Sequence, residues 1–277
     1  MTLPPGCTGA ERLGGGYINE AFRVRLGDGR EAFVKTRSNP MPGEYAAEAA
    51  GLQWLGSAGG LAVPPVLELD ERYLALAWVQ PGSLDGAGAE LLGQGLAAIH
   101  AAGAPCFGDP GWLGPARFGE LLLPNDPTED WPKFYAQRRL EPLARVAGAR
   151  RALSPAGQAA VAQICAAIEE LAGPAEPPAR LHGDLWGGNV MADSSGRPWL
   201  IDPSAYGGHR EVDLAMLRLF GGVPERTFSA YEEAWPLAPG WERRVALYQL
   251  LPLLVHAVLF GGSYGPAAER AALSLRG

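Results

Sequence analysis

The chain has 277 residues, of which 47% are hydrophobic and 19% are charged, as in an ordered globular protein. Its formal charge is −7, and this acidic balance argues against a nucleic-acid-binding protein, which would carry a basic stripe. The cysteines Cys7, Cys106 and Cys165 have no metal-ligand or CxxC spacing, so we expect reduced thiols in a cytoplasmic protein.

Neither end of the chain predicts a membrane protein. The N-terminal residues lack the basic start and apolar run of a signal peptide. The longest apolar run, residues 245–260, is interrupted by Gln249, Pro252 and His256 and is too short and too polar to span a bilayer. We therefore expect a soluble protein without a membrane partner.

The first 79 residues predict a small β-rich unit. Residues 20–36 alternate in polarity around Gly27-Asp28-Gly29, which predicts a hairpin with a glycine-rich turn, and a flexible Gly14-Gly15-Gly16 loop leads into its first strand. Residues 43–56 are rich in Ala and Glu and predict a helix, whereas residues 66–69 and 72–79 predict two more strands. Segment 80–88 is rich in Gly, Pro and Ser and has no apolar periodicity, which indicates a linker.

Beyond this linker the pattern is helical. Helices are predicted at residues 89–102, 130–147, 155–172, 210–220, 224–235, 239–260 and 265–275, with short strand-like pieces within 179–202. We expect an α+β fold with two lobes. These are an antiparallel β lobe with one main helix over residues 1–79, a hinge over 80–88, and a larger, mostly helical lobe over 89–277.

Lysine is rare in this chain, which draws attention to the lysines that remain. Only Lys35 and Lys133 occur among 23 basic residues. Lys35 lies on the second strand of the predicted hairpin, where kinases place the lysine that contacts the nucleotide phosphates, although a strand lysine is more often simply exposed. Glu48 on the next helix could hold it by an ion pair, and Glu44, one turn earlier, competes for that role. The Gly14-Gly15-Gly16 loop is weaker support for a nucleotide site, because it lacks the third glycine of a phosphate-binding loop.

The densest group of reactive side chains is HGDLWGGN at residues 182–189, followed by Asp202. A glycine and a proline between Asn189 and Asp202 predict a hairpin that brings these two oxygen ligands together, and such a pair suits Mg²⁺. Asp184 can then orient or deprotonate a hydroxyl group. The spacing is similar to the H-x-D-x-x-x-x-N loop of kinases. A purely structural loop is one alternative, and a metallohydrolase with His182 and Asp184 as ligands is another.

The motifs extend beyond a generic kinase pattern. The sequence resembles the fructosamine/ketosamine kinase family, a branch of the aminoglycoside phosphotransferase-like kinases with a protein-kinase-like fold. The segments that carry the resemblance are LGGGYINEAF near the start, FVK at 33–35, DWPKFYAQRRLEPL at 130–143, LHGDLWGGNV at 181–190, IDPSAYGGHREVDLAMLRLFGG at 201–222 and FSAYEEAWPLAPGWERRVALYQLLPLL at 228–254.

The resemblance implies ATP-dependent phosphorylation of the 3-hydroxyl of a ketosamine, either free or protein-bound, followed by breakdown that frees the amine. By position, it implies that Asp184 accepts the proton, Asn189 and Asp202 hold Mg²⁺, and Lys35, anchored by Glu48, contacts the phosphates.

The resemblance also implies roles outside the reacting groups. The hinge residues Trp78, Val79 and Gln80 would meet adenine through backbone groups, and Trp186 would form a wall of the sugar pocket. Asp213 is similar to the family's aspartate that braces the catalytic loop. His209 could contact substrate, or it could cap the helix that begins near Arg210.

The acceptor is expected to be small. Only eight residues separate Asp202 from Glu211, and the A-P-E motif of protein kinases is absent, so no platform for a peptide is predicted. An aminoglycoside or another small alcohol is the near alternative acceptor. A non-catalytic pseudokinase would lack at least one of Lys35, Asp184, Asn189 and Asp202, and all four are present.

Overall fold

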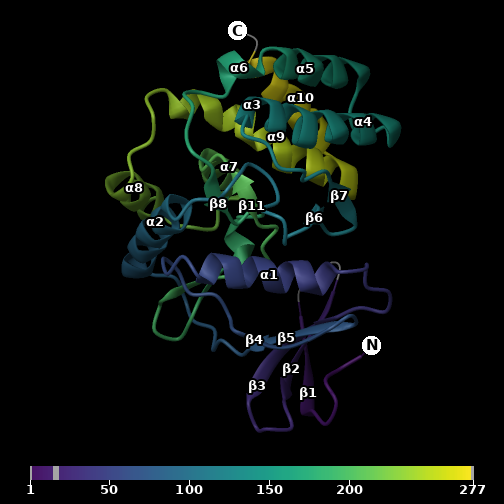
Figure 1. The fold of residues 1–277 in the computed structure, drawn as a ribbon, viewed down its shortest axis with the longest axis vertical. Helices are drawn as coiled ribbons and strands as arrows, with labels where there is room; N and C mark the ends of the chain where they lie inside the picture. The colour runs from purple at the N-terminus through teal and green to yellow at the C-terminus, as the bar shows by residue number, and fades with distance from the viewer. Residues whose placement is uncertain (1, 15–18, 276–277) are drawn as a thin grey trace.

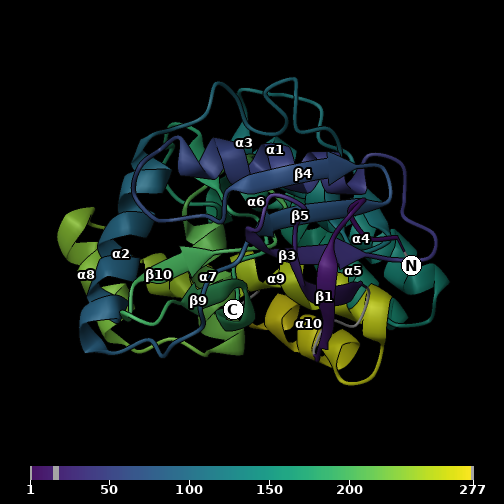
Figure 2. The same cartoon turned by 90° about the horizontal axis from the view of Figure 1, so that it is seen from below.

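A computed structural model describes residues 2–14 and 19–275 of the chain. The β-sheet occupies one end of the molecule and most helices the other, and α1 (Glu44–Gly56) crosses between them (Figure 1). Turned by 90°, the molecule shows the sheet strands against the helices behind them (Figure 2). The mixed α+β architecture predicted from the sequence is confirmed.

The N-terminal sheet is antiparallel and has the strand order β1-β2-β3-β5-β4. Its strands are β1 (Thr8–Leu13), β2 (Glu20–Arg25), β3 (Glu31–Thr36), β4 (Val66–Asp70) and β5 (Tyr73–Ala77). In β3, Val34 pairs with Phe22 and lies in the apolar cluster on one face. Because side chains alternate along a strand, Lys35 lies on the opposite face, which α1 covers with Ala49 and Leu52.

The predicted hairpin is present, but it does not begin the sheet. β2 and β3 are joined by a turn in which Gly29 has a φ of 88° and donates to the carbonyl of Leu26 at 2.9 Å. The expectation that the sheet starts with β2 is wrong, because β1 precedes it and pairs with its edge. The sequence of β1, TGAERL, is almost wholly exposed and has no apolar alternation, so its strand state depends on backbone pairing with β2.

Residues 78–85 connect the last sheet strand to α2 (Gly86–Ala101). The amide of Gly82 donates to the carbonyl of Ala192 at 2.8 Å, which fastens this segment to the second part of the chain. α2 begins three residues earlier than predicted, because the Asp85 side chain accepts a hydrogen bond from the amide of Gly88 and caps the helix.

Helices and short strand pairs make up the rest of the chain. The helices are α3 (Trp131–Tyr135), the π-helix η1 (Ala136–Leu140), α4 (Glu141–Ala149), α5 (Pro155–Ala166), α6 (Ile168–Leu171), the 3₁₀ turn η2 (Gly187–Asn189), α7 (Glu211–Phe220), α8 (Arg226–Ala234), α9 (Trp241–Phe260) and α10 (Tyr264–Ser274). The strands form the pairs β6 (Ala116–Phe118) with β7 (Leu121–Leu123), β8 (Ala179–Leu181) with β11 (Tyr206–Gly208), and β9 (Val190–Ala192) with β10 (Pro198–Leu200). The pair β6-β7 and strand β11 were not predicted, since three-residue strands carry no periodic signal.

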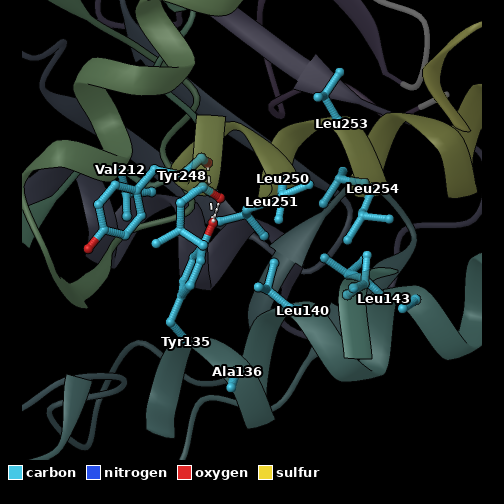
Figure 3. Close-up of a cluster of buried hydrophobic side chains, with 14 of the residues drawn as sticks. Tyr135, Ala136, Leu140, Leu143, Val212, Tyr248, Leu250, Leu251, Leu253 and Leu254 are labelled. Carbon is cyan, nitrogen blue, oxygen red and sulfur yellow. Dashed lines mark hydrogen bonds between the residues drawn. The ribbon is translucent and has the colours of Figure 1, made fainter. Parts of the chain in front are cut away.

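The main core surrounds α9. Leucines from α9 and η1 face one another there, and Tyr135 reaches the α9 backbone (Figure 3), where its hydroxyl donates to the carbonyl of Leu247 at 3.0 Å. By length and composition α9 is the one described helix that could cross a membrane, but 61% of its most apolar stretch is buried inside the protein. The apolarity of α9 is therefore accounted for by its place in the core.

Candidate active site

The ammonium group of Lys35 contacts carboxylates from two other segments of the chain. Its Nζ lies 2.8 Å from Oε2 of Glu48 on α1 and 2.7 Å from Oδ1 of Asp202, which follows β10. The lysine side chain is only 10% exposed. Burial disfavours the charge, but the carboxylates of Asp202 and Glu48 outweigh it and raise the pKa of Lys35. The ammonium group therefore stays charged in a partly enclosed site.

Of the two acidic side chains considered for this ion pair, Glu48 contacts the lysine. Glu44 instead accepts a hydrogen bond from the amide of Met41 at 2.7 Å and lies 3.8 Å from the guanidinium of Arg37. Burial raises the pKa of Glu48 above its usual range. Its second oxygen, Oε1, is buried and has no hydrogen-bond partner among the described residues.

Asp202 has an unusual backbone conformation. Its φ is 53°, in the left-handed region that non-glycine residues rarely occupy, and its side chain is 41% exposed. Such conformations are stable only when the surroundings enforce them, and they concentrate at functional sites. Here the β9-β10 pair on one side and the ion pair with Lys35 on the other hold the residue in place.

The loop before Asp184 is held by its backbone. The carboxylate of Asp213 on α7 accepts hydrogen bonds from the amides of His182 (2.7 Å) and Gly183 (2.9 Å). Gly183 has a φ of 81°, and a Cβ there would overlap the carbonyl oxygen of Ser204. This geometry matches the bracing role that the resemblance implied for Asp213.

Sequence reasoning missed one member of this bracing group. His100 on α2 is fully buried, and its Nε2 lies 3.2 Å from Oδ2 of Asp213, while its Nδ1 lies 2.8 Å from the hydroxyl of Tyr231. A histidine on the apolar face of a helix was the available signal, since a buried imidazole needs polar partners.

Asp184 and Asn189 lie together in the loop. Nδ2 of Asn189 donates to the backbone carbonyl of Asp184 at 2.8 Å and to its Oδ2 at 3.1 Å. The amide of Ile201 donates to the carbonyl of Asn189, so the β9-β10 pair brings Asn189 next to the residue before Asp202. Burial, and then the negative charge of Asp202, raise the pKa of Asp184 to about 7. A carboxyl group with such a pKa is suited to proton transfer at neutral pH.

Trp186 lies on the outside of the same loop. It is 41% exposed and packs edge-on against Phe220 at the end of α7, with ring centroids 6.4 Å apart. A Cβ at Gly188 would overlap the indole ring, so this glycine makes room for it. An accessible aromatic face two residues from Asp184 is available to a sugar ring.

His209, for which substrate contact and helix capping were both open, lies inside the protein just before α7. The residue is 2% exposed and its ring stacks on Tyr248 at 5.3 Å. Its Nδ1 accepts a hydrogen bond from the amide of Glu211 at 3.3 Å, which caps α7. The helix-capping alternative is therefore the one that the geometry supports, because a buried side chain cannot reach a ligand at the surface.

The predicted adenine segment has unused backbone donors. The amide of Trp78 donates to the carbonyl of Glu31 at 3.2 Å, and its ring lies under the guanidinium of Arg23. Within the described part of the chain, no hydrogen bond uses the amides of Val79 or Gln80.

Only part of the predicted glycine loop can be placed. Gly14 lies in an exposed position after β1, and a Cβ there would meet no atom within 4 Å. Gly15 and Gly16 lie outside the described residues, so the role predicted for this loop stays a prediction.

Asn189 and Asp202 fit a divalent cation that carries substrate phosphates. Because the amide nitrogen of Asn189 points to Asp184, its Oδ1 is left for a cation, and no hydrogen bond among the described residues engages that oxygen. Across residues 2–14 and 19–275, no group of three or more His, Cys, Asp or Glu side chains is placed to bind a metal. Two protein oxygens plus phosphate and water oxygens are what Mg²⁺ accepts, whereas a catalytic zinc needs three protein ligands.

Comparison with known proteins identifies the family. The family model described as fructosamine kinase matches residues 4–275. The chain belongs to the fructosamine kinase family. Its segments quoted above therefore resemble the family because of common descent.

Relatives match over most of their length. A curated relative from Thermus thermophilus, named a probable ketoamine kinase, is 40% identical over 94% of this chain and 91% of its own. A chloroplastic protein-ribulosamine 3-kinase of Oryza sativa is 31% identical over 94% of this chain and 77% of its own. A crystal structure from Thermobifida fusca, provisionally named a fructosamine-3-kinase, superposes with a TM-score of 0.90 at 42% identity, over 98% of this chain and 94% of that one.

More distant likeness establishes the fold alone. An aminoglycoside phosphotransferase structure shares 18% identity and a TM-score of 0.65, over 98% of this chain and 94% of that one. The predicted kinase-like fold of the aminoglycoside phosphotransferase type is confirmed. As a member of a kinase family, the protein is expected to use ATP as the phosphate donor.

Proposed function

We propose that the protein is an ATP-dependent ketosamine 3-kinase that acts on fructosamine or ribulosamine adducts of amines. The observation that carries the proposal is that the Lys35–Asp202 ion pair and the Asn189–Asp184 hydrogen bonds lie on adjoining segments, which the backbone bond from Ile201 to Asn189 joins. Phosphoryl transfer requires a positive side chain that binds the phosphates, oxygen ligands for a metal ion, and an acceptor for the proton of the hydroxyl group. Membership in the fructosamine kinase family and the name of the rice relative support the choice of acceptor.

The proposed reaction is a direct in-line transfer. The acceptor hydroxyl gives its proton to Asp184 while its oxygen forms a bond to the γ-phosphorus of ATP, and the bond from that phosphorus to the bridging oxygen breaks to release ADP. Lys35 holds the nucleotide phosphates, with Glu48 keeping its ammonium in position. Mg²⁺, when bound by Asn189 and Asp202, neutralises phosphate charge. Most of the rate enhancement then comes from positioning and charge neutralisation.

A small acceptor is favoured by the segment after Asp202. Residues from Ser204 to Gly208 are buried, and β11 within this segment pairs with β8. This leaves no exposed strand there for a substrate peptide to lie along, so a protein substrate would enter through its sugar-bearing side chain. Trp186, exposed beside Asp184, is the side chain that we assign to the sugar. We infer that release of the amine after phosphorylation makes this a cytoplasmic repair enzyme.

The proposal is tested by measuring ATP consumption with ribuloselysine, fructoselysine and kanamycin offered separately. We expect turnover of at least one ketosamine, and loss of about 10³-fold or more in Asp184→Asn, because this variant keeps the shape and loses the proton acceptor. Its affinity for ATP should stay within about twofold, since Asp184 does not bind nucleotide.

Each other outcome has a definite meaning. Turnover of kanamycin alone would refute the ketosamine assignment and make the protein an antibiotic kinase. If the protein binds nucleotide but turns over no acceptor, and Asp184→Asn changes neither result, the protein is a pseudokinase.

A further inference from the structure

Helix α1 is fastened to the second part of the chain at its C-terminal end. Nη1 of Arg180 donates to the carbonyl of Trp54 at 2.6 Å and to Oγ of Ser57 at 2.8 Å. The guanidinium also lies 4.8 Å over the Trp54 ring. Arg180 belongs to β8, which runs directly into the loop that carries Asp184. The end of α1 is therefore tied to the same strand that positions the proton acceptor.

The middle of α1 touches the segment that carries Asp202. A Cβ built on Gly51 would lie 3.1 Å from Cγ of Pro203 and 3.3 Å from Cβ of Ala205, so a side chain there would fit only if the helix and this segment moved slightly apart. A glycine inside a helix costs about 1 kcal/mol relative to alanine. Close packing against Pro203 is the physical reason for a glycine at this place.

The start of α1 is held as well. Nη2 of Arg117, on β6, donates to the carbonyl of Pro42 at 2.8 Å, just before the helix begins. Contacts with the second part of the chain thus lie along the whole length of α1, which Figure 1 shows crossing between the sheet and the helices. Glu48 lies between these contacts, one turn before Gly51.

From these contacts we infer that Gly51 and Arg180 are positioning residues for the nucleotide phosphates, because they hold α1 where Glu48 meets Lys35. The inference rests on the proposed role of Lys35 in binding ATP. Asp202 reaches Lys35 from the segment that Gly51 contacts. The packing of α1 against this segment therefore fixes the positions of both carboxylates around the ammonium, those of Glu48 and Asp202.

The first test is the affinity for a non-hydrolysable ATP analogue with Mg²⁺, measured by calorimetry, which needs no acceptor. Gly51→Val should weaken binding on the order of tenfold, because displacement of a positioned group by about 1 Å is costly. Ala46→Val, which adds a branched side chain on the exposed face of the same helix, should change the affinity by less than about twofold.

A double-mutant cycle separates positioning from general damage. If Gly51 acts through Glu48, Gly51→Val should add less than about twofold to the loss already seen in Glu48→Gln. Equal losses in both backgrounds would show that Gly51 does not act through the ion pair and would overturn the inference.

Milder variants guard against misfolding. Gly51→Ala favours the helix, so it should keep the thermal midpoint while weakening nucleotide binding by about two- to threefold. Arg180→Gln should also weaken binding, and Arg180→Lys should restore part of the loss, since a lysine can still donate to the carbonyl of Trp54.

The two hypotheses fail in different ways. Wild-type protein that binds no nucleotide would refute the proposed function and this inference with it. Normal wild-type binding that is unchanged in Gly51→Val and Arg180→Gln would overturn only the inference.

Discussion

His209 lies in the interior among charged groups and aromatic rings. Its Nε2 is 3.8 Å from the carboxylate of Glu176, which pairs with Arg210, and Arg244 lies nearby on α9. Burial is the largest influence, and it lowers the pKa of His209 from 6.5 to about 4. As the pH falls below 6.5, His209 therefore becomes protonated in the unfolded chain while it stays neutral in the folded protein.

This shift predicts a loss of stability in mild acid. Because the pKa of His209 is lower in the folded than in the unfolded protein, the neutral imidazole contributes stability that is fully present above the unfolded pKa. This stability is lost as the pH falls below the unfolded pKa. We expect the free energy of unfolding to drop between pH 7 and pH 5 by about 2 kcal/mol more in wild type than in His209→Asn, which keeps an acceptor for the Glu211 amide. Urea unfolding at both pH values measures this difference, and parallel curves for the two proteins would contradict it.

At the scale of elements, the π-helix η1 places an arginine inside the core. Arg139 is fully buried, and its guanidinium contacts the rings of both Phe134 (4.5 Å) and Tyr206 (4.3 Å). It donates to the carbonyl of Pro124 at 2.6 Å and to Oδ1 of Asn125 at 2.8 Å. Tyr206 lies in β11 beside the catalytic loop, so this arginine links the long connection after α2 to the strand that supports the loop.

Arg139 is expected to be a stabilising residue. In Arg139→Met both acceptors would stay buried without donors, which should cost about 2–4 kcal/mol of unfolding free energy. The neighbouring Arg138→Met, at a more exposed position of the same helix, should stay within about 0.5 kcal/mol of wild type. Urea denaturation compares the two variants, and equal losses would show that burial of Arg139 is not the cause.

At the scale of the whole molecule, the proposed nucleotide site lies where the sheet, α1 and the helical part meet. Lys35 comes from the sheet, Glu48 from α1 and Asp202 from the hairpin in the second part. A ligand bound there touches groups from all three. Binding should therefore stabilise the fold as a unit.

The two lysines of the chain allow a matched test of this coupling. MgATP at a hundred times its dissociation constant should stabilise wild type by about 2.7 kcal/mol, seen as a rise in thermal midpoint. Lys35→Met should lose most of this rise, because the phosphates lose their cation. Lys133→Met should keep it, since Lys133 is exposed and pairs with nearby Asp130. A full rise in Lys35→Met would contradict the role proposed for Lys35.

Local sequence patterns were sufficient for the elements with long, regular signals. The hairpin of β2 and β3, helix α1 and the long helices α7 and α9 follow from alternation, composition and helical periodicity. Strand β1 and the β6-β7 pair could not be predicted in this way, because β1 has no apolar alternation and strands of three residues carry no periodic signal.

The candidate site residues Lys35, Asp184, Asn189 and Asp202 could be predicted from the sequence alone, because their identity and spacing are local properties of the chain. Only the tertiary structure decided that Glu48 and not Glu44 meets the lysine, and that His209 caps a helix inside the core. Both outcomes depend on which face of a helix packs against which neighbour. Packing of this kind is a property of segments far apart in the chain, so no local pattern encodes it.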